Sequence, residues 1–149
     1  MLGSTTGQVK GTISQSSLLQ NNKNTLQFAG PNSFIQAGDF TKQCIGDAEV
    51  CTYGITISLI LRLDKDAAGW RTKTFLFDSI NDDTFSTSRG VSLYVENGQI
   101  KVVVQTMQKK WSLYKSLRAD IWQHVAVTWT QKKLQLYING VQRWAVETV

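Results

Sequence analysis

Apolar and polar residues alternate with a period of two through most of the chain beyond residue 25. The clearest run covers residues 55–63, where one set of alternate positions is entirely apolar: Ile55, Ile57, Leu59, Leu61 and Leu63. Successive side chains of a β-strand point to opposite faces, so this run predicts a central core strand. No stretch keeps the three- and four-residue apolar spacing of an amphipathic helix. The chain is therefore expected to be all β.

Short polar segments join the alternating runs into hairpins. Residues 91–105 alternate on both sides of Asn97-Gly98, and Asn-Gly is the pair best suited to the positive φ angles of a type I′ turn. Residues 125–138 form a second hairpin pattern, and Asn139-Gly140 begins a third. At least six strands joined by short turns predict a two-sheet antiparallel jelly-roll sandwich, with Trp129 in its core.

The first part of the chain has a different composition. Up to about residue 24 it consists mainly of Gly, Ser, Thr, Gln and Asn, with few apolar anchors. We expect residues 1–24 to be a loosely ordered lead-in and residues 25–149 to form one jelly-roll domain.

Charge and hydropathy restrict the partners and the compartment. The formal net charge of +5 makes polyanions candidate partners on electrostatic grounds, although the charge alone does not choose among them. No run reaches the 18 or more apolar residues of a membrane-spanning helix. Residues 1–7 lack the basic and apolar regions of a secretory signal, as an excised domain also would.

One part of the sequence carries a family resemblance. The segment WQHVAVTW at residues 122–129, followed by LYING at 136–140, resembles the signature of laminin-G-like and pentraxin-like domains. Residues 55–59 and 90–95 resemble two further strands of that family, so the resemblance covers roughly residues 26–144. It implies a concanavalin A-like jelly roll. Such domains usually continue for several strands after the Asn-Gly turn, so the chain is expected to be an incomplete domain.

The resemblance also implies a class of function, namely a non-catalytic extracellular or cell-surface module that binds glycans or protein partners through its loops. One alternative is a carbohydrate-active enzyme, or an accessory carbohydrate-binding module, of the same fold; another is an oligomerising module of pentraxin type. A glycosidase needs two carboxylates placed across the sugar. The acidic residues here fall in loops or at strand ends, and His124 stands at a strand start without a nucleophile motif. Catalysis is therefore not expected.

Two cysteines, Cys44 and Cys51, enclose a short polar loop just before the first long core strand. In a domain with an extracellular resemblance, an even pair suggests a disulfide. The alternative is a pair of reduced thiols in a cytosolic protein. A zinc site is not expected, because there is no second pair of ligands and His124 is the single histidine.

Basic residues gather in two late segments and suggest sulfated polysaccharides as ligands. Lysine can contact a sulfate and an aromatic ring can stack on a sugar, although exposed lysines are often only solvated charge. The candidate binding residues are Lys109, Lys110, Trp111, Lys132 and Lys133. No nucleic-acid-binding motif accompanies them.

A metal site has weaker support. Asp64 and Asp66 follow the first core strand, where pentraxin-like relatives place part of a calcium site. We expect no cofactor, with Ca²⁺ as the one candidate ion.

Overall fold

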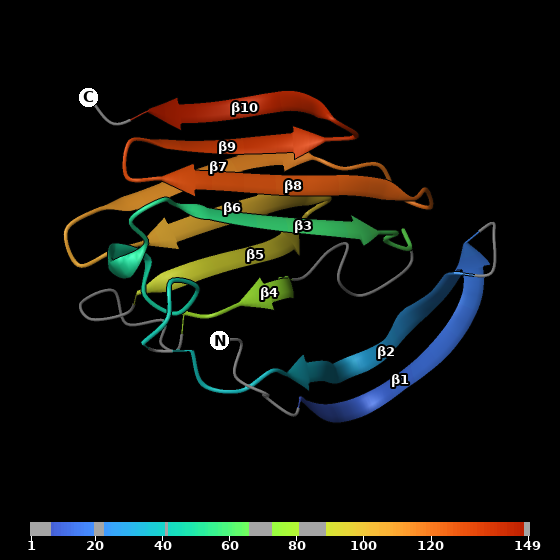
Figure 1. Ribbon diagram of the computed structural model, residues 1–149. Coiled ribbons are helices and arrows are strands. Elements are labelled where there is room, and N and C mark those ends of the chain that lie inside the picture. The colour runs from blue at the N-terminus through green and yellow to red at the C-terminus, as the bar shows by residue number, and fades with distance from the viewer. Residues whose placement is uncertain (1–6, 20–22, 41, 66–72, 81–88, 148–149) are drawn as a thin grey trace. The chain divides into compact units, whose positions relative to one another are not determined.

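The computed structural model describes residues 7–19, 23–40, 42–65, 73–80 and 89–147. The chain divides into two compact units, residues 1–39 and residues 40–149 (Figure 1). The family-like strands all belong to the second unit.

The first unit is a long antiparallel hairpin of β1 (Gln8–Leu19) and β2 (Lys23–Gln36). Ile13 pairs with Phe28 in its register. The structure thus differs from the expected loosely ordered lead-in, and the division falls near residue 39 rather than 24. The physical reason is that a two-stranded ribbon can expose both faces to water. Ser, Thr and Gln then form strands without the apolar alternation by which strands are recognised.

The second unit contains two four-stranded antiparallel sheets, which confirms the predicted sandwich. The strand orders are β10-β9-β8-β3 and β4-β5-β6-β7. The strands of the first sheet are β3 (Ile55–Leu61), β8 (Gln123–Thr130), β9 (Lys133–Ile138) and β10 (Val141–Glu147). Those of the second are β4 (Thr74–Asp78), β5 (Gly90–Glu96), β6 (Gln99–Gln105) and β7 (Lys110–Ser116). A short 3₁₀ helix, η1 (Ala48–Val50), precedes β3.

The core lies between the two sheets and is built from the alternate positions that the sequence pattern identified. The fully buried side chains of β5 and β6 face those of β8 and β9, and the largest of them is that of Trp129. Its ring meets the ring of Trp111 edge-on, with centroids 5.3 Å apart. The prediction that Trp129 belongs to the core is confirmed.

The two Asn-Gly pairs form the predicted turns. Asn97 and Gly98 have φ angles of 52° and 68°, and Asn139 and Gly140 have 52° and 76°. Positive φ at both central residues is the type I′ arrangement, which matches the twist of the flanking strands.

Strand β3 is not in the centre of its sheet. Its register is with β8 alone, so it forms an edge of the described sheet. Ile57 is buried, whereas Ile60 on the other face is largely exposed. The alternation had correctly reported which face is buried, but it carries no information on the number of neighbouring strands.

The described part of the chain holds no helix of the length and apolarity that crossing a membrane requires.

Candidate functional site

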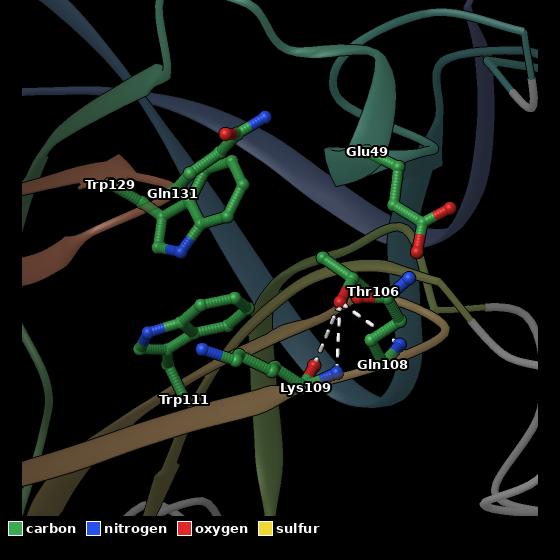
Figure 2. A pocket seen from close by; sticks show the side chains of 7 residues that line it. All are labelled: Glu49, Thr106, Gln108, Lys109, Trp111, Trp129 and Gln131. Carbon is green, nitrogen blue, oxygen red and sulfur yellow. Dashed lines mark hydrogen bonds between the residues drawn. The ribbon is translucent and has the colours of Figure 1, made fainter. Parts of the chain in front are cut away.

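An open hollow of about 320 Å³ lies at one end of the sandwich. It is bordered by η1, by the 106–109 turn between β6 and β7, and by the turn that follows β8. Figure 2 shows the two tryptophans on one side of it and Glu49, Thr106 and Gln108 on the other. The lining residues are Glu49, Thr106, Gln108, Lys109, Trp111, Trp129 and Gln131.

The apolar wall of the hollow consists of Trp111 from β7 and Trp129 from β8. Their edge-on contact joins the two sheets at this end, and both side chains are almost completely buried. Neither indole Nε1 has a hydrogen-bond partner among the described residues. Buried N–H groups are normally paired, so these two donors are an exception.

The polar rim is formed by a tight turn. Thr106 N donates to the Lys109 carbonyl over 2.9 Å, and Thr106 Oγ1 accepts from the Lys109 N–H over 3.0 Å. These bonds fix the backbone from which the Lys109 side chain reaches the hollow. The amide of Gln131 comes to the same hollow from the turn after β8.

Glu49 connects this rim to the cysteine loop. Its Oε1 accepts from the Met107 N–H over 2.8 Å, across 58 positions of sequence. Arg89 Nη1 lies 3.4 Å from Glu49 Oε2 and 2.8 Å from Asp47 Oδ2. Arg89 thus pairs with both carboxylates of this part of the rim.

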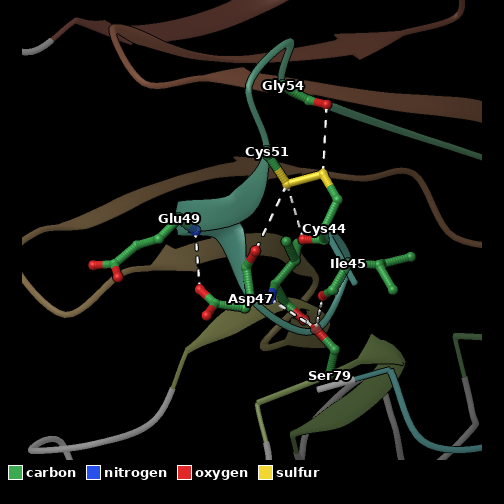
Figure 3. The surroundings of a disulfide bond; sticks show 8 residues. Cys44, Ile45, Asp47, Glu49, Cys51, Gly54 and Ser79 are labelled. Atoms are coloured by element: carbon green, nitrogen blue, oxygen red, sulfur yellow. Dashed lines mark hydrogen bonds between the residues drawn. A yellow bond between two sulfur atoms is a disulfide. The ribbon is translucent and has the colours of Figure 1, made fainter. Parts of the chain in front are cut away.

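The Cys44–Cys51 disulfide closes the loop that carries Asp47 and Glu49. The two Cα atoms are 4.8 Å apart, within the normal range for a disulfide. Inside the loop the Asp47 side chain accepts from the Glu49 N–H and thereby caps η1 (Figure 3). The predicted pairing of Cys44 with Cys51 is confirmed. The disulfide also fixes the position of Glu49, which accepts the Met107 N–H of the 106–109 turn.

The structure brings the two predicted basic segments to one end of the sandwich. Lys109 lines the hollow, and Gln131, which directly precedes Lys132 and Lys133, lines it too. Lys109, Lys110 and Lys132 are exposed, and Lys133 is partly buried at the start of β9. Two turns more than 20 residues apart therefore border the same depression.

Trp111 does not behave as expected. Its side chain is only 4% exposed and points into the core, whereas Lys110 and Ser112 point outward. Strand alternation is the reason: the residue after an outward lysine must face inward. This corrects the expectation that Trp111 presents an open ring to a ligand from solution.

Sequence analysis missed a row of side chains on the outward face of β4-β5-β6-β7. Phe75 pairs with Tyr94, Tyr94 with Lys101, and Lys101 with Tyr114 in the strand registers. The sequence offered one signal for this row, namely the alternation that places positions 110, 112 and 114 of β7 on its outward face. Recognising the row also required the register of four strands, which the sequence does not show.

The acidic and histidine candidates lie elsewhere. Asp64 follows β3, near the point where Lys65 N donates to Asp120 Oδ1, and Asp66 lies outside the described residues. Within the described ranges no group of three potential metal-ligating side chains occurs. His124 Nε2 is 2.7 Å from Ser58 Oγ, and its backbone N–H donates to Asn139 Oδ1. His124 thus belongs to the bonding between β8 and the Asn139 turn.

Comparison with known proteins adds a family and a fold. Residues 37–147 match the Laminin_G_3 model, described as the concanavalin A-like lectin/glucanases superfamily. No curated protein matches the chain.

Several of the similar solved structures are domains of botulinum neurotoxin. The receptor binding domain of the C/D mosaic serotype is 17% identical over 96% of this chain and 34% of that one, with a TM-score of 0.69. The serotype D binding domain is 16% identical over the same shares, with a TM-score of 0.66. The serotype D ligand binding domain in complex with N-acetylneuraminic acid is 22% identical over 62% and 24%, with a TM-score of 0.52. The chain thus spans a quarter to a third of these structures, and such identities show the fold alone.

Proposed function

The chain belongs to the concanavalin A-like lectin/glucanase superfamily, and from this premise we propose that it is a non-catalytic extracellular module that recognises anionic glycans. The ligand class that fits best is a sulfated polysaccharide. The proposed binding surface is the end of the sandwich that carries two basic turns, one with Lys109 and Lys110 and the other with Lys132 and Lys133.

The observation that carries this proposal is the convergence of two basic turns on one hollow. Ammonium groups on separate turns can contact successive sulfates of a chain, and a fixed scaffold reduces the entropy lost when they are positioned. The rigidity comes from the Thr106–Lys109 bonds and from Glu49 on its disulfide-closed loop. A similar fold, the serotype D domain, has been crystallised with an acidic sugar, which supports an anionic ligand.

The geometry does not favour hydrolysis. Of the residues that line the hollow only Glu49 carries a carboxylate, and that group is held by Arg89 and the Met107 N–H. Retaining and inverting glycosidases both require two carboxylates facing the scissile bond. The disulfide supports an oxidising, extracellular compartment, since such bonds rarely persist in the cytosol.

Heparin-affinity chromatography tests the proposal. The wild-type chain should be retained at low salt and released as the salt rises, because exposed charge contacts are screened beyond about 8 Å at 0.15 M. Replacing both Lys109 and Lys110 by Ala should lower the eluting salt concentration, and adding Lys132→Ala and Lys133→Ala should lower it further.

The matched control removes equal charge from elsewhere. Lys10→Ala with Lys42→Ala deletes two exposed lysines outside the two turns. If this control elutes as early as the Lys109/Lys110 variant, retention depends only on net charge and the proposed surface is wrong.

A further inference from the structure

A second depression, of about 240 Å³, lies on the outward face of β5, β6 and β7. Lys110, Ser112 and Tyr114 come from β7, Lys101 and Val103 from β6, and Tyr94 from β5. Val103 and Ser112 are register partners and small residues. Their size leaves a hollow between a row of large side chains and Lys110.

The row of large side chains crosses four strands. Phe75, Tyr94, Lys101 and Tyr114 follow one another from β4 to β7. Because neighbouring strands are about 4.8 Å apart, Tyr94 and Tyr114 are separated by about 10 Å.

The rings of this row are not equally available. Lys73 Nζ lies 4.6 Å from the Phe75 centroid and 4.7 Å from that of Tyr94, and Lys101 Nζ lies 5.9 Å from Tyr94. Cation–π contacts of this kind hold the lysines in place over the rings. Tyr114 has no such contact among the described residues and is 64% exposed, so its ring can stack on a ligand.

The cationic groups of the depression are two lysines. Lys101 and Lys110 line it, and no lining residue carries a carboxylate. Glu96 accepts a hydrogen bond from Lys101 Nζ over 2.5 Å, and this bond raises the pKa of Lys101 above its ordinary value. The position of Lys101 is fixed by Glu96 and by the ring of Tyr94.

We propose that this depression is a second binding site, which takes one sugar ring of a linear, carboxylate-bearing polysaccharide. The ring stacks on Tyr114 above Ser112 and Val103, and its carboxylate contacts Lys101 and Lys110. The site shares Lys110 with the turns at the end of the sandwich, but its specificity depends on one aromatic ring and a carboxylate rather than on clustered positive charge.

A single-stranded nucleic acid would use the same kinds of residue, but it stacks successive bases on successive open rings. Here Tyr94 is already covered by lysines, and one open ring, that of Tyr114, remains in the described row. The lectin relationship also favours a sugar.

Calorimetric titration of the full chain with a hyaluronan octasaccharide tests the site, since this probe has carboxylates and no sulfate. Tyr114→Ala should weaken binding roughly tenfold, a loss of about 1.4 kcal/mol, and Ser112→Leu should weaken it similarly by filling the depression. Tyr53→Ala, which removes a tyrosine that is 96% exposed elsewhere, is the matched control and should bind as wild type. Circular dichroism of each variant identifies any that fails to fold; Ser112→Leu and Tyr114→Ala are both surface changes, and either one alone tests the site.

Two competing probes complete the experiment. Uncharged cellohexaose should bind more weakly than the hyaluronan octasaccharide, and equal binding would overturn the assignment of a carboxylate ligand. Tighter, Tyr114-dependent binding of a dT12 oligonucleotide would overturn it in favour of nucleic acid. The Lys109/Lys110 and Lys132/Lys133 turns are tested by heparin, so Lys109→Ala with Lys132→Ala should leave hyaluronan binding within about twofold of wild type. The two proposals can therefore fail independently, because heparin retention tests the turns and hyaluronan binding tests the depression.

Discussion

Single residues at the junction of the two sheets carry much of the stability of the sandwich. Trp129 is 2% exposed and packs edge-on against Trp111, so each ring fills space that no neighbour could occupy without rearrangement. Close packing of this kind makes the loss of a large side chain costly, because the surroundings relax only partly into the cavity.

Trp129→Ala is therefore expected to destabilise the domain by about 3–5 kcal/mol, a large share of a typical domain's stability. Urea unfolding followed by circular dichroism measures the change. Trp144→Ala is the matched control, since Trp144 is 54% exposed and should cost much less. Equal midpoints for the two variants would show that the ring of Trp129 is not a core element.

At the level of elements, the cysteine loop and the 106–109 turn act as one assembly. The disulfide fixes η1, Glu49 accepts the Met107 N–H, and the Thr106 bonds close the turn that presents Lys109. Glu49 and the disulfide thus determine where Lys109, a residue of the proposed binding surface, lies.

Replacing Cys44 and Cys51 by Ala should lower the free energy of unfolding by about 2–3 kcal/mol, the entropy value for so short a loop. Chemical denaturation in the absence of reductant measures it. A change below about 0.5 kcal/mol would mean that the loop is held mainly by Asp47, Glu49 and Arg89.

Glu49→Ala should act locally. The Met107 N–H loses its acceptor, so amide hydrogen exchange at residues 106–109 should accelerate while exchange in β8 stays unchanged. Glu49→Gln keeps an acceptor oxygen and should restore most of the protection. Uniformly faster exchange throughout the sandwich would instead show that Glu49 supports the whole fold.

For the whole molecule, the core belongs to one of the two units. Every residue of the buried cluster lies between Ala48 and Ile138, within the second unit. The hairpin of residues 8–36 supplies none of these side chains, and an isolated two-stranded hairpin is at best marginally stable in water.

A chain beginning at Phe40 should therefore unfold in a single cooperative transition, with a Tm within about 5 °C of that of the full chain. Differential scanning calorimetry provides the comparison. Loss of cooperativity in the shorter chain would show that the hairpin is needed to complete the sandwich.

The sequence by itself determined which faces of the strands are buried. The alternation at 91–105 and 125–138 and the two Asn-Gly turns are local features with a fixed geometric meaning, so the two-sheet class and the burial of Trp129 could be predicted. The proximity of Cys44 and Cys51 along the chain, together with the family resemblance, was likewise sufficient for the disulfide.

Only the tertiary structure decided which residues come together. Whether β3 is central or at an edge, and whether Lys109 and Gln131 border one hollow, depends on contacts between distant segments. Trp111 points inward because of its position in the alternation of β7, which the neighbouring lysines in the sequence did not indicate. Tyr94, Lys101 and Tyr114 form a row only because their three strands are aligned in register. Alternation is a one-dimensional property, whereas a binding surface is assembled across strands by backbone hydrogen bonds that the sequence pattern does not encode.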